Sequence, residues 1–270
     1  MARVPVLSLL VVALAACSTT PPTASSPPAN PPATATAPAP APAAQPDAKA
    51  VDPAVIQALN DMGAYLRSLK QYEVFIDLSG ERVLADGQKL QHTATADIDV
   101  MPPNKLRAKM RTARSQRDLI YDGKTVTLYV PDQKYYSKAD FSENLGVLTE
   151  RLRARFGVEI PSADLFLWGT PAAPVDNIQS AMNAGQDIVS GEVCDHYAFR
   201  QGDVDWQIWI AAGGKPLPRK LVITSRADEA RPQSVTLYKW NLNPKFGNAA
   251  FAFTPPPGAK LAEFVPLKSR

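Results

Sequence analysis

The clearest structural signal in the chain lies at residues 105–141, which read KLRAKMRTARSQRDLIYDGKTVTLYVPDQKYYSKADF. The alternation of side chains predicts four consecutive strands with tight turns, at residues 105–111, 116–121, 124–130 and 134–138. Asp122-Gly123 suits a two-residue hairpin loop, in which both residues adopt positive φ. That loop would set Leu119 opposite Val126. Strands in this order form an antiparallel meander, which has one face to bury.

The first of these strands carries a basic side chain at every second position. Alternate residues of a strand share a face, so one face is predicted to hold four cations: Lys105, Arg107, Lys109 and Arg111. Such a face could bind lipid phosphate or an acidic envelope protein. It could equally be a solvated surface, since Asp97 of the preceding strand can pair across the turn with Arg107. In the same way Asp99 can pair with Lys105.

Residues 51–270 are expected to form one folded domain. Asp52 and Pro53 suit the cap and the first position of a helix, and apolar residues then recur at helical spacing as far as Leu69. A second helix is predicted at residues 142–156. Eight more runs have strand character, and we expect about eleven strands in all: residues 72–79, 90–100, 187–193, 194–200, 204–211, 219–226, 234–242 and 251–253. Residues 177–184 are ambiguous between helix and strand.

Two apolar stretches are candidates for the lining of an interior space. Residues 163–168 are apolar nearly all round, so we expect them to be buried or to face an apolar cavity. In strand 204–211 every second residue from Val204 to Ile210 is apolar, which gives one wholly apolar face. Both stretches supply the expected lining residues: Phe166, Trp168, Trp206 and Ile208. The sequence leaves open whether this space is a cavity or a packed core.

Residues 1–16 have the features of a lipoprotein signal peptide. Arg3 precedes an apolar run that is too short to span a bilayer. The run ends Leu14-Ala15-Ala16-Cys17, which resembles the lipobox of bacterial lipoproteins. The resemblance implies cleavage before Cys17, attachment of diacylglyceryl to its thiol and acylation of the new amine. Several acyl chains together make a stable membrane anchor.

The segment after Cys17 is expected to be a tether. Ser18 at the next position resembles the outer-membrane sorting pattern of Gram-negative lipoproteins, which implies a lipid anchor at the periplasmic face of the outer membrane. From there to residue 50 the chain is almost entirely Pro, Ala, Thr and Ser. Such a composition cannot bury enough apolar surface to fold. Residues 17–50 are therefore predicted to be a disordered, extended linker to the domain.

Few residues are suited to catalysis or metal binding. Cys194 and His196 would share a strand face, but the chain has only two histidines, and zinc sites use three or four protein ligands. The alternative to a catalytic or metal site is a half-buried strand that carries one free thiol. No Gly-rich phosphate loop precedes a helix, and no nucleophile elbow is present. A net charge of +3 is too small to indicate a nucleic-acid binder. We expect no catalytic residue, no metal and no cofactor.

Two parts of the sequence resemble known families. Tyr121-Asp122-Gly123-Lys124, followed by Leu128-Tyr129-Val130-Pro131, is similar to a hairpin of the LolA/LolB superfamily. The runs CDHYAFR, VDWQIWI and LPRKL between residues 194 and 221 resemble, more specifically, a proteobacterial family of predicted periplasmic lipoproteins without an established function. The resemblance implies an α+β fold, an unclosed antiparallel β-barrel with helices plugging its mouth. In relatives with this fold the interior holds acyl chains or lipoproteins, while others act as envelope sensors.

Together these features predict a non-enzymatic, membrane-anchored periplasmic lipoprotein. Its half-barrel would bind a lipid or other amphiphile, as part of lipid or lipoprotein handling in the envelope. The apolar loop with which LolB inserts lipoproteins has no counterpart in this sequence. The alternative is an envelope protein-interaction or stress-sensor module without a small ligand, which would bind its partner protein through the sheet edge or the basic face.

Overall fold

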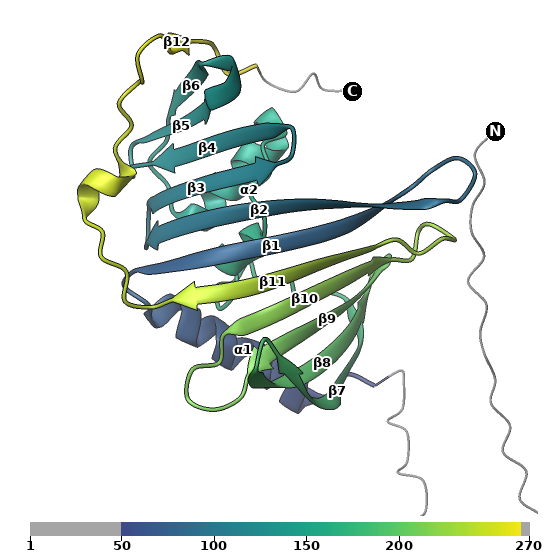
Figure 1. Ribbon diagram of the computed structural model, residues 1–270. Helices are drawn as coiled ribbons and strands as arrows, with labels where there is room; N and C mark the ends of the chain where they lie inside the picture. Colours follow the sequence, from purple (N-terminus) through teal and green to yellow (C-terminus); the bar gives the residue numbers. More distant parts are fainter. Residues whose placement is uncertain (1–49, 266–270) are drawn as a thin grey trace, which may run out of the picture. The chain divides into compact units, whose positions relative to one another are not determined.

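Strands of both halves of the chain join in one sheet, with the order β12-β6-β5-β4-β3-β2-β1-β11-β10-β9-β8-β7 (Figure 1). The computed structural model describes residues 50–265, which belong to one compact unit. The first half supplies β1 (Tyr72–Val83), β2 (Lys89–Met101), β3 (Lys105–Thr112), β4 (Ser115–Tyr121), β5 (Thr125–Val130) and β6 (Tyr135–Asp140). The second supplies β7 (Ile178–Val189), β8 (Glu192–Gln201), β9 (Val204–Ala211), β10 (Pro218–Ser225), β11 (Gln233–Asn241) and the short β12 (Lys260–Leu261).

The sheet does not close, because β12 and β7 form its two edges. All neighbouring strands are antiparallel except β12, which runs parallel to β6. The expected α+β class and unclosed antiparallel sheet are confirmed, with twelve strands rather than about eleven. The signal peptide, the lipidated Cys17 and nearly all of the tether lie outside the described residues. Among residues 50–265, no helix combines the length and the hydrophobicity needed to cross a membrane.

The hairpin at Asp122-Gly123 has a longer loop than the sequence predicts. Tyr121 pairs with Val126, and Leu119 pairs with Leu128, so residues 122–125 form the connection. Asp122 does not adopt positive φ; only Gly123 does, at 97°. Instead, Asp122 Oδ1 accepts hydrogen bonds from the backbone N–H groups of residues 124 and 125, each at 2.8 Å. This Asx turn replaces the two-residue loop. The register differs from the predicted one by two residues, an even number, so each side chain still lies on the predicted face of the sheet.

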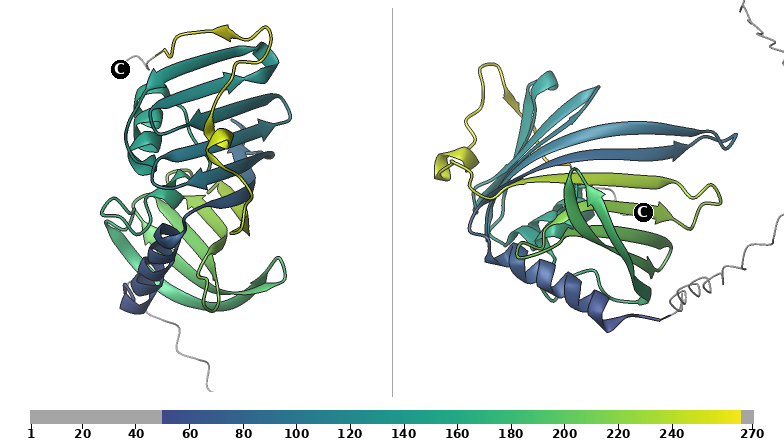
Figure 2. Two further views of the ribbon diagram at one scale, coloured as in Figure 1. Left: turned by 90° about the vertical axis from the view of Figure 1, so that its left-hand side faces the viewer. Right: turned by 60° about the horizontal axis from the view of Figure 1, so that its bottom comes forward.

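Two helices cover one face of the sheet (Figures 1 and 2). Helix α1 (Pro53–Ser68) begins at Asp52, whose carboxylate accepts from the N–H of Ala54 at 2.8 Å. Helix α2 (Leu145–Phe156) begins later than predicted, because Asn144 is its cap and accepts from the N–H of Val147. Apolar residues of both helices share one core with the sheet residues beneath them. We call this side the helix face; Val74, Ile98, Leu119 and Ile208 lie on it, and the opposite side is the open face.

The C-terminal segment runs from the middle of the sheet to its β6 edge. It leaves β11, passes through the short helix η3 (Asn248–Phe251) and adds β12 beside β6. Phe253 packs against Tyr129 and Tyr136, with ring centroids 5.6 and 5.3 Å away. Phe264 then reaches Phe156 at the end of α2, at 4.8 Å. This segment therefore ties the edge of the sheet to α2.

The segment that follows the short helix η2 (Ala163–Phe166) crosses α1 at unusually close range. A Cβ atom at Gly63 would lie only 2.4 Å from Gly169 N, and one at Gly169 would lie 2.6 Å from Gly63 C. Gly169 also has φ of +72°, which favours glycine. Backbone thus rests directly on backbone, and neither residue can carry a side chain without movement.

We expect Gly63→Ala to destabilise the protein by about 1–3 kcal/mol, because the added methyl group overpacks this crossing. In a helix without this crossing, the same change would stabilise the helix by up to ~1 kcal/mol. The sign of the change in unfolding free energy therefore shows whether the methyl group meets the backbone of Gly169. Urea unfolding followed by tryptophan fluorescence measures it. Gly214→Ala is the matched control, since a Cβ there meets nothing within 4 Å. A Gly63→Ala variant as stable as the parent protein would contradict the crossing.

Candidate functional site

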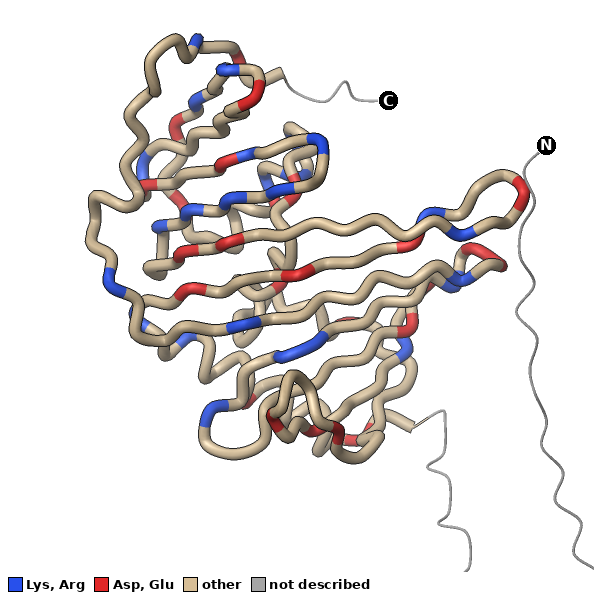
Figure 3. Tube along the Cα trace, in the orientation of Figure 1, with Lys and Arg blue, Asp and Glu red and all other residues tan. Residues whose placement is uncertain are grey.

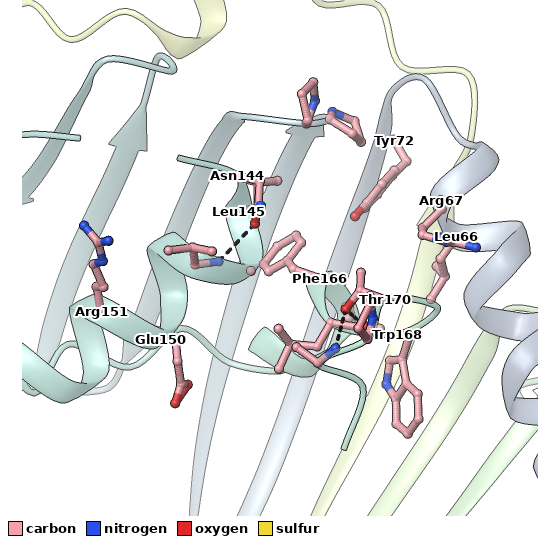
Figure 4. Close-up of a pocket in the computed structure, with 18 residues that line it drawn as sticks. Leu66, Arg67, Tyr72, Asn144, Leu145, Glu150, Arg151, Phe166, Trp168 and Thr170 are labelled. Carbon is pink, nitrogen blue, oxygen red and sulfur yellow. Dashed lines mark hydrogen bonds between the residues drawn. The ribbon is translucent and has the colours of Figure 1, made fainter. Parts of the chain in front are cut away.

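The main pocket lies beside the Gly63–Gly169 crossing and has a volume of about 690 Å³ (Figure 4). Its walls come from the end of α1, the start of β1, the β2–β3 turn, the first half of α2 and residues 165–172. Five separate segments therefore have to meet to form it. A volume of this size is within the range of small-molecule binding sites.

Most of the pocket wall is apolar. Figure 4 shows Phe166 between α2 and the side that carries Tyr72, Trp168 and Leu66. The remaining apolar side chains of the lining come from the β2–β3 turn, the first turn of α2 and residues 165–172: Pro102, Pro103, Leu145, Val147, Leu165, Leu167, Pro171 and Ala172. Rigid prolines and packed helices need little rearrangement on binding, so the pocket is largely preformed.

Two of the polar lining residues are already hydrogen-bonded within the protein. Asn144 caps α2, and Thr170 Oγ1 donates to the carbonyl of Leu167 at 2.6 Å. Tyr72 differs from them. Its side chain is buried, with 3% exposed, and its ring packs 5.4 Å from that of Trp240. No residue between 50 and 265 hydrogen-bonds its hydroxyl group, which points toward the pocket in Figure 4.

Burial raises the pKa of the Tyr72 phenol well above its usual value. The hydroxyl group therefore stays protonated at neutral pH and remains a hydrogen-bond donor.

Three charged residues line the pocket, and two of them have partners. Arg151 lies 3.6 Å from the Glu143 carboxylate and 5.3 Å over the Phe141 ring. Glu150 pairs with Arg153 one turn along α2. The third is Arg67, in the last turn of α1. Within the described part of the chain, its guanidinium group takes part in no ion pair or side-chain hydrogen bond.

The structure separates the four predicted lining residues into two groups. Phe166 and Trp168 line the pocket. Trp206 and Ile208 do not; they lie on the helix face of β9, inside the core. The Trp206 ring stacks on Phe199 at 3.8 Å and lies 6.1 Å from Trp168. Trp206 therefore supports the pocket wall from behind, through Trp168.

Sequence reasoning missed the residues that give the pocket its polar end. Tyr72 reads only as the first residue of a strand, and Arg67 as the polar side of a helix. One signal did exist: Met101-Pro102-Pro103 interrupts two regular strands, and two of these residues line the pocket.

The predicted basic residues lie on the open face of β3, beside acidic residues of β2 (Figure 3). The register sets Asp97 opposite Lys109 and Asp99 opposite Arg107, so the expected pairings of Asp97 with Arg107 and of Asp99 with Lys105 are wrong. Asp97 is hydrogen-bonded by Arg111, while Lys105 donates to Asn248 Oδ1 at 2.6 Å. Burial, with the nearby Glu73 carboxylate, raises the pKa of Asp99. Charges on this face therefore alternate in sign.

Cys194 and His196 share the open face without forming a catalytic pair. Cys194 is fully buried, and its thiol lies 3.5 Å from the carbonyl of Glu192. His196 stacks on Trp209 at 4.0 Å; its Nε2 is 3.0 Å from Gln207 Oε1, and its Nδ1 is 3.3 Å from an Asp187 oxygen. The stacking on Trp209 and these two polar contacts therefore account for His196: its ring packs on the sheet, and both of its nitrogens have partners within the protein. In residues 50–265, no group of three or more Cys, His, Asp or Glu side chains could hold a metal ion.

The comparisons with known proteins give a family for the chain. A family model described as "Predicted periplasmic protein (DUF2092)" matches residues 55–265, which confirms the predicted resemblance to such a family. No curated protein matches the chain significantly.

Among solved structures, the chain is similar to lipoprotein LppX of Mycobacterium tuberculosis, with 12% identity, a TM-score of 0.45, and 70% of this chain and 96% of that chain covered. It is also similar to an uncharacterized conserved protein of Thermus thermophilus, with 10% identity and a TM-score of 0.45; the match covers 78% of this chain and 99% of that chain. A third similar structure is that of a LolA superfamily protein of Nitrosomonas europaea, with 10% identity and a TM-score of 0.36; the match covers 74% of this chain and 97% of that chain.

The Cys194 thiol should react slowly with iodoacetamide in the folded protein. It is buried, and burial raises its pKa, so the reactive thiolate is scarcer at any given pH than for a free cysteine. We expect alkylation, measured by intact mass, to be at least about tenfold slower than in urea. Cys194→Ser identifies the thiol that reacts. Fast alkylation of the folded protein would restore Cys194 as a candidate nucleophile.

Proposed function

We propose that this chain, which belongs to the DUF2092 family of predicted periplasmic proteins, binds the apolar part of a lipid or other amphiphile in the pocket between α1 and α2. The observation that carries the proposal is a preformed pocket of about 690 Å³ with a largely apolar wall. The protein would hold its ligand without transforming it.

The energetics favour an acyl chain as the group in the pocket. Each buried methylene group contributes about 0.8 kcal/mol, so about ten of them would contribute roughly 8 kcal/mol. Ordering the chain and losing its freedom of movement cost several kcal/mol. With a cost of about 4 kcal/mol, the balance of roughly 4 kcal/mol corresponds to an affinity of about 1 mM, and each further buried methylene group would tighten it about fourfold.

We further propose that residues 1–16 are a signal peptide, that Cys17 is lipidated, and that the anchor lies at the periplasmic face of the outer membrane. Residues 17–50 would then tether the domain of residues 51–270. A proline-rich linker of this length could extend to about 100 Å at ~3.1 Å per residue. The pocket could thus meet its ligand well away from the anchoring membrane.

The basic face of β3 has weaker support as a partner-binding site. Arg111 and Lys105 already contact Asp97 and Asn248, and acidic residues stand opposite the other two cations. A partner protein would have to displace these contacts before it could use the four charges, so the pocket is the better candidate site.

Native mass spectrometry of the gently extracted protein should reveal a bound lipid, and the emptied protein should bind a fluorescent acyl probe. Ala172→Trp should weaken binding by about tenfold or more, equivalent to at least ~1.4 kcal/mol, because the indole would fill the pocket from its rim. Ala154→Trp is the control, since Ala154 is exposed on α2 outside the pocket. If neither a lipid nor the probe binds, the proposed function is wrong.

The anchor has its own test. Cys17→Ser should shift the protein from the membrane fraction to the soluble periplasmic fraction and remove the mass of the acyl groups. Cys194→Ser, which changes the other cysteine of the chain, should leave both unchanged. Continued sedimentation of the Cys17→Ser protein with membranes would contradict lipidation at this residue.

A further inference from the structure

We infer that the ligand is a single-chain amphiphile with an anionic head group, and that Arg67 and Tyr72 hold this head at one end of the pocket. The inference rests on the proposed function and adds the charge and the orientation of the ligand. It assigns to the head an oxygen that accepts a hydrogen bond from Tyr72, and a negative charge that pairs with Arg67.

The first argument is that Tyr72 presents to the pocket a hydroxyl group that has no partner within the described part of the protein. Its oxygen is not among the fully buried side-chain atoms without a partner, so it is accessible from the pocket, and a ligand placed against it has to supply a hydrogen bond in place of water. Tyr72 is 3% exposed, points toward the pocket (Figure 4) and has no hydrogen-bond partner among residues 50–265. Tyr197 is also buried and likewise has no hydrogen-bond partner among the described residues, but it does not line the pocket. The hydroxyl group of Tyr121 donates to Glu143 O, and that of Tyr238 bonds to Ser162 Oγ. A ligand oxygen would satisfy Tyr72 in the same way.

The second argument is the unpaired charge of Arg67. Of the charged residues that line the pocket, Glu150 and Arg151 are engaged by neighbours on or beside α2, whereas Arg67 is not paired within the described residues. The side chain of Arg67 is exposed, and its Nε lies close to the crossing, since a Cβ at Gly169 would be 2.8 Å from it. A guanidinium group without a partner is well suited to bind carboxylate or phosphate oxygens.

The third argument is orientation. Figure 4 shows Arg67 and Tyr72 on the same side of the pocket, while Glu150 lies on the opposite side beyond Phe166. Arg151 lies on that opposite side too, but it already pairs with Glu143, as Glu150 does with Arg153. The lining cation without a partner is therefore at the α1 end, which is where the anionic head lies. The apolar chain then runs along Phe166 toward the first turn of α2. Carboxylate and phosphate heads share this chemistry.

Three probes with the same alkyl chain length test the inference: palmitate, hexadecyl phosphate and hexadecanol. Their affinities for the delipidated full chain can be measured by displacement of a fluorescent acyl probe. We expect at least one of the two anions to bind about tenfold or more tightly than the alcohol, because charge-assisted hydrogen bonds are the stronger ones. Which anion binds best identifies the carboxylate or the phosphate as the source of the charge.

Two variants assign the effect to residues. Arg67→Gln should weaken palmitate and hexadecyl phosphate about tenfold, and hexadecanol much less, so that the preference for anions is lost. Tyr72→Phe should weaken all three probes several-fold, because each carries an oxygen in its head. Lys70→Gln is the control for charge, since Lys70 is exposed just beyond α1 and does not line the pocket; it should retain the preference.

The outcomes separate the two proposals. If the parent protein binds the alcohol as tightly as both anions, or if Arg67→Gln retains the preference, the inference about the head group is wrong while amphiphile binding stands. If none of the three probes binds, the proposed function itself fails.

Discussion

The contact between the backbones of Gly63 and Gly169 is the constraint on which the site depends. It brings the segment after η2 against α1 at a distance that no side chain would permit. Trp168 can then enter the core near Trp206, while the other side of the same segment forms the pocket wall. The contact also lays Arg67 against Gly169. The apolar wall and the charged end of the pocket are therefore positioned by one crossing.

Much of the fold could be predicted from the sequence, because strands of a half-buried sheet alternate regularly. The predicted strands of the meander lie within two residues of β3 to β6. Other features depend on contacts that alternation does not encode. The Asp122 loop depends on a side-chain hydrogen bond, and β12 is only two residues long. Around Gly185, β7 has an irregular register, which explains why residues 177–184 showed no clear strand pattern.

The site was less predictable than the fold. A period of two shows which side chains share a face, so it placed Trp206 and Ile208 correctly on the side toward the helices. It does not show which element covers them; in the structure, the Trp168 ring lies 6.1 Å from that of Trp206. The pocket forms where the end of α1, the β2–β3 turn and α2 converge. The sequence pattern of a single segment does not show which distant segments it will contact. Arg67 and Tyr72 therefore could not be distinguished from ordinary helix and strand residues.

The pairing of β1 with β11 has a consequence for how the molecule assembles. The two strands join along Glu73–Gly80 and Ser234–Asn241, so the first strand of the sheet receives its second neighbour only when almost the whole chain is present. Loop closure over such a separation slows folding, and an unpaired strand edge invites aggregation in the meantime. The two meanders, β1 to β6 and β7 to β11, are each built from local hairpins and can form first. The separation in sequence between β1 and β11 therefore predicts that the docking of the two meanders is slower than the formation of either one.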